Sequence, residues 1–222
     1  ANDETRTAKL IGFTLLNGGD LHGGAINIEG ASPTIENCIL IDSKSHAVNS
    51  WNSSPKFINC LFTGTDGKPI YFNSNYAYPE VINCTFVNNN DYGLFNSHNY
   101  IPDIKNCIIY NNTDGGVFGQ FEINYSNIEG GWYDGVGNID TDPLFCDHTI
   151  GDYSIAQNSP CVGSGENGAN MGALGVGCTE PTVYGCTTSS ACNYNETATI
   201  DDDSCTYPEE NYACDGDCIV DA

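Results

Sequence analysis

An Asn-Cys pair recurs four times along the chain, each time four residues after a proline and between apolar residues. Its cysteines, Cys38, Cys60, Cys84 and Cys107, are 22, 24 and 23 residues apart. A repeat of this length, made of short apolar segments and turns, is typical of a solenoid, in which each repeat packs only on its neighbours. We therefore predict that the repeats stack as the rungs of a rod.

A second set of apolar residues recurs in step with the cysteines. Four of its members precede a cysteine by 12 residues, and a fifth continues the series beyond the last cysteine. We predict that this set forms another inward-facing column of the same rod. Its members are Ile26, Val48, Phe72, Phe95 and Phe118.

The residue before each cysteine is an asparagine, and Asn and Gly tolerate the positive φ of a tight bend. A bend resets the alternation of a strand, so that Ile35 and Cys38 can both point inward although they are three residues apart. We extend the pattern by one rung at each end. The predicted core column is Phe13, Cys38, Cys60, Cys84, Cys107 and Tyr125. The predicted bend column is Gly12, Asn37, Asn59, Asn83, Asn106 and Asn124.

Parallel rungs direct the four stacked cysteine side chains the same way, whereas a disulfide needs a Cβ–S–S–Cβ torsion of about 90°. We therefore expect these cysteines to be buried free thiols that act as small apolar residues. A metal-binding ladder is an alternative, and the apolar column disfavours it because it lacks mixed ligands.

These repeats resemble the right-handed parallel β-helix family, the pectate-lyase-like proteins with short degenerate repeats. The segments 137–145, 151–155, 158–162 and 171–174 resemble the terminal block of bacterial secreted β-helix proteins. The resemblance covers residues 9–176 and implies an all-β solenoid of about six rungs, roughly 4.8 Å apart, that occupies residues 1–176. It implies little about activity, because such rods include both enzymes and inert spacers.

Residues 177–222 are expected to form a separate Cys-rich acidic module, because they lack apolar columns. Residues 179–222 contain ten acids and no Lys or Arg. Small modules replace a missing core with disulfides, and the six cysteines here allow fifteen pairings. They are Cys178, Cys186, Cys192, Cys205, Cys214 and Cys218. Cys146 and Cys161, which flank the end of the β-helix, are expected to pair with each other.

Part of this module, around Gly185–Asn195 and Ala198–Cys205, resembles a short repeat of large secreted surface proteins of marine bacteria. Clustered aspartates suit Ca²⁺, which takes six to eight oxygen ligands. The candidate calcium ligands are Asp201, Asp202, Asp203, Asp215 and Asp217. The alternative is a solvated acidic linker held by disulfides, and no other cofactor is expected.

The formal net charge of −23, with 6 basic and 29 acidic residues, argues against nucleic acid and anionic membranes as partners, since both are bound through Lys and Arg. No stretch is apolar enough for membrane insertion. Dense cysteine in a polar segment indicates an oxidising compartment. We therefore expect an extracellular or cell-surface protein.

Catalysis is not expected. A β-helix lyase would need basic residues in a row beside an aspartate cluster. The basic residues of this chain form no such row. Asp66, Asp91 and Asp114 follow the cysteines by six or seven residues, and adjacent rungs would place two of them about 5 Å apart, near the separation in retaining glycosidases. Each lies beside or near a glycine, however, which indicates ordinary turns.

Two surface features point to sugars. Asn52, Asn111 and Asn195 begin N-x-S/T sequons in loop-like segments and are candidate glycosylation sites. Trp51, Tyr71 and other aromatic residues lie near asparagines. Such a combination can bind neutral glycans by ring stacking and amide hydrogen bonds, or can simply cover the rod.

The leading hypothesis is a non-catalytic extracellular structural or adhesive protein. Because the sequence starts inside a repeat, we expect an open strand edge that pairs with another chain. This edge favours end-to-end self-association into a filament or matrix fibre, and other surface proteins are alternative partners. The competing hypothesis is a carbohydrate-binding or polysaccharide-degrading β-helix protein.

Overall fold

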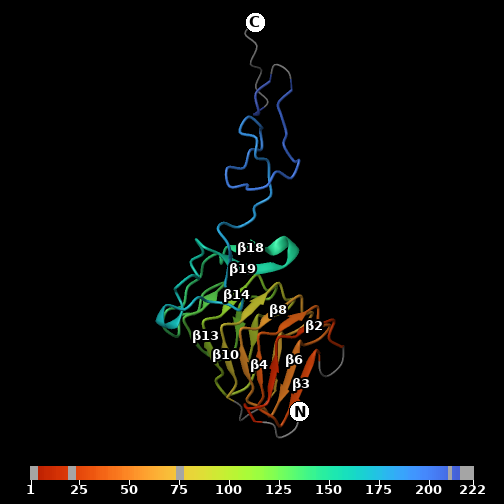
Figure 1. Ribbon diagram of the computed structural model, residues 1–222, viewed down its shortest axis with the longest axis vertical. Helices are drawn as coiled ribbons and strands as arrows, with labels where there is room; N and C mark the ends of the chain where they lie inside the picture. Colours follow the sequence, from red (N-terminus) through yellow and green to blue (C-terminus); the bar gives the residue numbers. More distant parts are fainter. Residues whose placement is uncertain (1–4, 20–23, 74–77, 210–211, 216–222) are drawn as a thin grey trace.

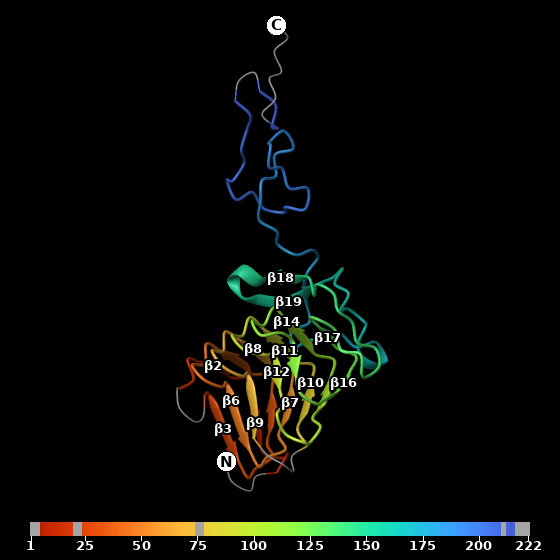
Figure 2. The ribbon, with the colours of Figure 1, turned by 180° about the vertical axis from the view of Figure 1, so that it is seen from behind.

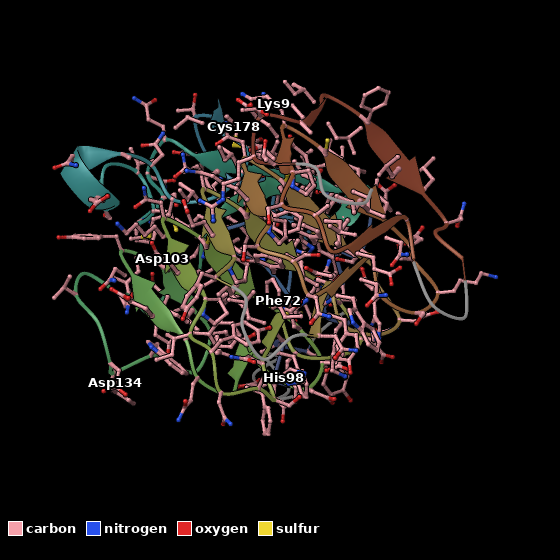
Figure 3. All side chains as sticks on the ribbon, turned by 90° about the horizontal axis from the view of Figure 1, so that it is seen from below. Lys9, Phe72, His98, Asp103, Asp134 and Cys178 are labelled. Carbon is pink, nitrogen blue, oxygen red and sulfur yellow. A yellow bond between two sulfur atoms is a disulfide. The ribbon has the colours of Figure 1, made fainter. Side chains whose placement is uncertain are left out.

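The chain forms a β-solenoid whose rungs stack side by side and end at a smaller terminal block (Figure 1). The computed structural model describes residues 5–19, 24–73, 78–209 and 212–215. Side chains crowd the interior around Phe72, whereas Asp134 lies at the periphery (Figure 3). The predicted all-β solenoid is confirmed.

Three parallel sheets form the walls of the solenoid, and each rung contributes one strand to each sheet, except that the last rung has no strand in sheet C. Sheet A contains β1 (Lys9–Ile11), β4 (Thr34–Glu36), β7 (Lys56–Ile58), β10 (Glu80–Ile82), β13 (Asp103–Lys105) and β16 (Glu122–Asn124). Sheet B contains β2 (Thr14–Leu16), β5 (Ile39–Ile41), β8 (Leu61–Thr63), β11 (Thr85–Val87), β14 (Ile108–Tyr110) and β17 (Asn127–Ile128). Sheet C contains β3 (Ile26–Glu29), β6 (Val48–Trp51), β9 (Ile70–Asn73), β12 (Leu94–Phe95) and β15 (Val117–Phe118).

The predicted bend between sheets A and B is present in every rung. Gly12, Asn37, Asn59, Asn83 and Asn106 all have positive φ, between 51° and 75°. Glycine carries no Cβ and the short Asn side chain bonds locally, so both adopt this conformation at low cost.

The last rung corrects the sequence prediction by one residue. Tyr125, not Asn124, has the positive φ, at 51°, because Lys105 pairs with Asn124. Ser126 therefore takes the inward position that was assigned to Tyr125, and its fully buried hydroxyl accepts the amide of Cys107 at 3.0 Å. A small hydroxyl fits this interior, where a tyrosine ring would not.

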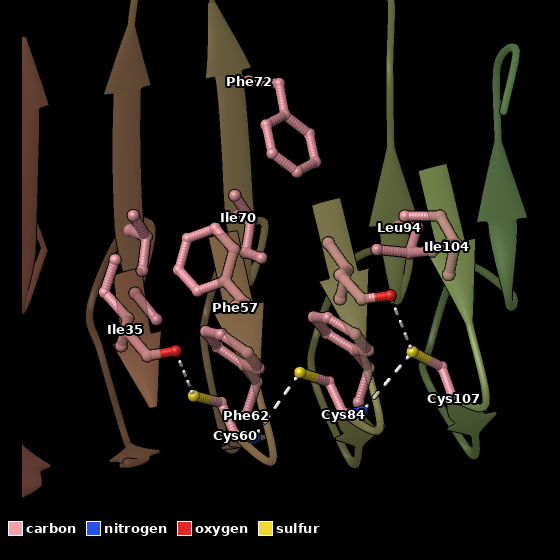
Figure 4. Close-up of a cluster of buried hydrophobic side chains, with 14 of the residues drawn as sticks. Ile35, Phe57, Cys60, Phe62, Ile70, Phe72, Cys84, Leu94, Ile104 and Cys107 are labelled. Atoms are coloured by element: carbon pink, nitrogen blue, oxygen red, sulfur yellow. Dashed lines mark hydrogen bonds between the residues drawn. The ribbon is translucent and has the colours of Figure 1, made fainter. Parts of the chain in front are cut away.

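The cysteine column is buried and its thiols are free. The amide of Cys60 donates to the Cys84 sulfur at 3.4 Å, and that of Cys84 donates to the Cys107 sulfur at the same distance (Figure 4). The Cys84 and Cys107 sulfurs thus each accept a hydrogen bond from the cysteine amide of the preceding rung, which the bend turns out of the strand ladder. Phe13 occupies the same register in the first rung but is 54% exposed, because β2 lies at a sheet edge.

The second predicted column is wrong from the third rung onward. Val48 pairs with Ile70, whereas Phe72 pairs with Ser50. Phe95 pairs with Tyr71 and faces outward, as does the exposed Phe118. In the four rungs that contain the cysteines, the turn between sheets B and C has constant length, so the inward residue follows the cysteine by ten positions, while the turn from sheet C to sheet A varies. The true column is Ile26, Val48, Ile70, Leu94 and Val117.

A second bend column follows sheet B, and the sequence analysis did not predict it. Its members have φ between 52° and 66°. The residue after each bend points inward. They are Asn17, Asp42, Gly64, Asn88 and Asn111. Asn89 and Asn112, which follow two of these bends, are buried, and the Asn89 amide donates to the Asn112 Oδ1 at 3.2 Å.

The terminal block packs on sheet B. It contains β18 (Phe145–Asp147), β19 (Asp152–Ala156), β20 (Val176–Cys178) and the short 3-10 helices η1 (His148–Ile150) and η2 (Glu166–Gly168). Phe145, Tyr153 and Met171 share a second core with Leu61 and Ile108 of the solenoid. The terminal block therefore covers β8, β11 and β14 of sheet B, whereas Thr14 and Leu16 of β2 are exposed.

The expected Cys146–Cys161 disulfide is wrong. Cys146 instead bonds to Cys178, whose Cα lies 5.8 Å away. Cys161 is buried with a free thiol that accepts a hydrogen bond from the Asn127 amide at 3.2 Å.

Beyond the terminal block, residues 184–209 extend away from the solenoid in both views (Figures 1 and 2). Two further disulfides hold this segment, Cys186–Cys205 and Cys192–Cys214. Cys218 lies outside the described residues.

Candidate functional site: the outer face of sheet C

The outer face of sheet C carries eight outward-pointing residues, of which only one is charged. Alternation along the strands directs their neighbours into the core. The eight comprise one acid, three amides and four aromatic rings. They are Glu29, Asn27, Asn49, Asn73, Trp51, Tyr71, Phe95 and Phe118. On a chain with a net charge of −23, a face of this composition is distinctive.

Trp51 lies at the amide-rich end of this face, where β3, β6 and β9 run side by side (Figure 2). Its side chain is 48% exposed and lines a shallow cleft of about 220 Å³ together with Asn27, Glu29 and Asn49. The Asn49 Nδ2 donates to the Asn27 Oδ1 at 3.0 Å. The cleft therefore combines an indole with an ordered pair of amides and one carboxylate.

The other aromatic residues of this face each stack on a neighbouring ring, and Phe118 is in addition 47% exposed. The rings of Phe95 and Phe118 lie 5.2 Å apart and nearly parallel, and Tyr92 packs against Phe118 at the same distance. Tyr71 stacks on His46 at 4.7 Å. Among the described residues Trp51 has no such ring partner, so its indole is the aromatic surface of this face that a ligand can cover.

The charges that border the face neutralise each other. Lys68 Nζ lies 3.0 Å from the Asp91 Oδ2 and 4.2 Å from the centre of the Phe95 ring. His46 accepts the Lys68 amide on Nδ1 at 3.1 Å. Burial lowers the pKa of His46, and the Lys68 charge lowers it further, so this imidazole is neutral at pH 7. Lys68, Asp91 and His46 together thus add no net charge to the border of the face.

Sequence reasoning found half of this site. It noted Trp51 and Tyr71 as aromatic residues near asparagines, but it placed Phe95 and Phe118 in the core. The constant ten-residue distance from each cysteine to the next inward residue was the signal that could have placed them outward, since alternate strand residues face opposite sides.

The aspartates considered for hydrolysis do not form a carboxylate pair. The register places Asn90, not Asp91, beside Asp66, and the Asn90 Nδ2 donates to the Asp66 Oδ1 at 3.0 Å. Asp91 is paired with Lys68. The predicted approach of two carboxylates in adjacent rungs is therefore wrong for Asp66 and Asp91.

The candidate calcium ligands cap turns in the tail. Asp201 accepts the Thr187 hydroxyl at 2.8 Å, and Asp202 accepts the Ser204 amide at 3.0 Å. In the part of the chain that the structure describes, which includes Asp203 and Asp215, no three His, Cys, Asp or Glu residues are placed to hold a metal ion. Asp217 lies outside that part.

The three sequons differ in accessibility. Asn52 is exposed at a bend, and Asn111 is exposed with its Nδ2 bonded to the Asn88 Oδ1 at 2.6 Å. Asn195 is half-buried, and its Oδ1 accepts the Thr197 hydroxyl at 2.7 Å. Glycosylation of these residues stays a prediction.

Comparisons with known proteins bear on the fold. The family model described as "Right handed beta helix region" matches residues 2–143. Neither the curated proteins nor the solved structures gave a significant match. Among the described residues, no helix has the length and apolar character needed to cross a bilayer.

Proposed function

The chain belongs to the right-handed β-helix family, and from this premise we propose that it is a non-catalytic extracellular protein that adheres to neutral glycans through the outer face of sheet C. The observation that carries the proposal is the composition of that face, with one acid among eight outward residues on a chain of net charge −23. Three disulfides are compatible with an oxidising exterior.

Trp51 is the proposed centre of binding. Indole rings bury a large apolar area and present a polar N–H at the edge, which suits a sugar ring with one apolar face. The Asn27–Asn49 amide pair and the Glu29 carboxylate, in the same cleft, supply donors and acceptors for sugar hydroxyls. The flat sheet allows an extended chain to lie across several rungs.

The absence of catalysis is part of the proposal. A retaining or inverting glycosidase needs two free carboxyl groups facing one substrate. The aspartates nearest the face are held by other groups, since Lys68 binds Asp91 and Asn90 binds Asp66. Glu29 is the one carboxylate on the face itself.

The test is titration of the protein with neutral β-glucan and chitin oligosaccharides by calorimetry. Trp51→Ala should weaken binding to the best ligand by about thirtyfold, since a central tryptophan commonly contributes about 2 kcal/mol or more. Tyr133→Ala is the control, because Tyr133 is a 96% exposed aromatic residue that does not line the Trp51 cleft. Equal affinity of the two variants, or release of reducing ends during the titration, would contradict the proposal.

A second proposal concerns self-association through the first rung. Its strands β1, β2 and β3 each lie at the edge of a sheet, and Ile11, Phe13 and Leu16 expose apolar surface there. At the other end, residues 136–139 cover the rung through the Tyr125–Val136 and Ile128–Ile139 hydrogen bonds. An uncovered apolar strand edge favours pairing with another chain.

Sedimentation velocity over a range of protein concentrations tests this second proposal. The wild-type segment should form dimers or longer species, and Leu16→Lys should shift the population to monomer. Monomeric behaviour of the wild type up to millimolar concentration would overturn the idea without affecting the glycan proposal, which rests on a different face.

A further inference from the structure

A cavity of about 260 Å³ lies between the solenoid, the terminal block and the first residues of the tail. It is separate from sheet C, because its solenoid wall consists of the ends of β11 and β14 in sheet B and the bends that follow them. At roughly 30 Å³ per water molecule, the volume suits a ligand of about eight non-hydrogen atoms.

Three polar side chains in this cavity have no hydrogen bond within the described residues. They are the phenol of Tyr110, the imidazole of His148 and the Oδ2 of Asp142, whose Oδ1 accepts the Leu144 amide at 2.9 Å. The remaining wall combines apolar residues, among them Val87, Leu144 and Phe145, with the polar residues Asn88, Asn111 and Thr182. A mainly apolar pocket with a few converging polar groups is the usual form of a small-molecule site.

The cavity carries a negative field. Burial raises the pKa of Tyr110, and the charges of Asp142, Glu129 and Asp140 raise it further, which places three carboxylates near this ring. No Lys or Arg lines the cavity. An anionic ligand is therefore disfavoured, and a cation that touches an aromatic ring and a carboxylate is favoured.

The outer wall of the cavity is fixed in place. Residues 181–183 close it, and the Thr182 amide donates to the Cys146 carbonyl at 2.6 Å. The Cys146–Cys178 disulfide ties the same segment to β18. The Tyr184 hydroxyl donates to the Asp147 Oδ2 at 3.3 Å. These contacts keep the cavity formed in the absence of a ligand, which lowers the entropic cost of binding.

We propose that this cavity binds a small organic cation of the alkylammonium class, with the ammonium group between Tyr110 and Asp142 and a polar substituent at His148. The cation lies over the phenol ring and beside the unoccupied carboxylate oxygen. The apolar wall formed by Val87, Leu144 and Phe145 receives the alkyl groups.

Choline is the probe, because its charge does not depend on pH and its size matches the cavity. Its neutral isostere, 3,3-dimethylbutan-1-ol, has the same shape without the charge. Calorimetry or ligand-observed NMR on the full chain should give choline at least tenfold tighter binding than the alcohol. Equal binding of the two would overturn the cationic ligand, and binding of neither would overturn the site.

Asp142→Asn isolates the charge, because the asparagine Oδ1 can still accept the Leu144 amide and the turn is retained. This variant should bind choline about tenfold more weakly than the wild type. Asp134→Asn, which removes the same charge from an exposed residue that does not line the cavity, should leave choline binding unchanged. An equal loss in both variants would show a general charge effect and refute the site.

Discussion

Replacing Asn89 with alanine should destabilise the solenoid by about 3–5 kcal/mol. Asn89 is fully buried, and its Oδ1 accepts the Thr65 amide at 3.1 Å. Its Nδ2 donates to the Phe62 carbonyl at 3.2 Å and to the Asn112 Oδ1 at 2.9 Å. The variant leaves the Thr65 amide as a buried orphan, which costs about 1–3 kcal/mol, and removes two further bonds worth about 1 kcal/mol each.

Asn90→Ala is the matched control for this experiment. Asn90 is the next residue in the chain, but it is exposed and its side chain donates only to the Asp66 carboxylate. Substitutions at such surface positions usually change stability by less than about 0.5 kcal/mol. The two variants therefore differ in burial and not in residue type.

Urea unfolding, followed by circular dichroism and by tryptophan fluorescence, gives the free energy of unfolding for both variants. Coincident transitions by the two probes are needed, because stacked repeats can unfold in parts. The urea midpoint should fall for Asn89→Ala with an unchanged slope. A difference of less than 1 kcal/mol between the variants would refute the view that this buried amide holds the bends together.

Two further predictions concern titration and reactivity. The hydrogen bond from the Lys68 amide requires neutral His46, and burial and the Lys68 charge lower the pKa of His46. The stabilising effect of neutral His46 is therefore complete above the ordinary pKa of about 6.5. It is lost as the pH falls through the lower pKa of the folded state. The drop in Tm between pH 7.5 and pH 5 should be smaller in His46→Gln than in the exposed-site control His148→Gln, and equal drops would contradict this. All five free thiols are buried, so peptide mapping should find them unmodified after maleimide treatment of the native protein and modified after unfolding. Rapid native labelling of any of the five, which are Cys38, Cys60, Cys84, Cys107 and Cys161, would show that the column opens.

The fold could be predicted because its repeat is marked at positions where few residue types fit. An asparagine at each bend and a cysteine after it recur with little variation, and the structure places Asn37 and Cys38 as expected. Stacking in parallel then follows, since each rung can bury its apolar side only against the next.

The errors arose where the pattern had more than one solution. The choice between Ile70 and Phe72 as the partner of Val48 depends on which turn has constant length, and both residues are buried. The bend residue after sheet B is Asn, Asp or Gly, depending on the rung, so no single residue type marks these bends. The partner of Cys146 depends on how the terminal block folds back, which spacing does not determine.

The candidate site could be predicted only in part for the same reason. Trp51 was noted because it is a tryptophan beside Asn52. The low charge of the face, with Glu29 as its one acid, emerges only when five strands are in register, and it involves residues from 27 to 118. The cavity beside sheet B could not be predicted from the sequence, because its walls come from three separate parts of the chain.

The hydrogen bonds that the backbone amides of the cysteine column donate run in one direction along the rod. The Cys60 amide donates to Cys84, the Cys84 amide to Cys107, and the Cys107 amide to Ser126. The Ser126 amide in turn donates to the Asn138 side chain, which does not belong to the repeat.

This direction matters during synthesis, because a ribosome delivers the chain from its N-terminus. Each newly made rung has an unsatisfied bend until the following rung emerges, so the growing end of the nascent rod remains open. Closure comes only with Asn138, after the last repeat has been made. A nascent chain arrested before that residue would expose its final bend, and such incomplete chains are the species most prone to misassembly.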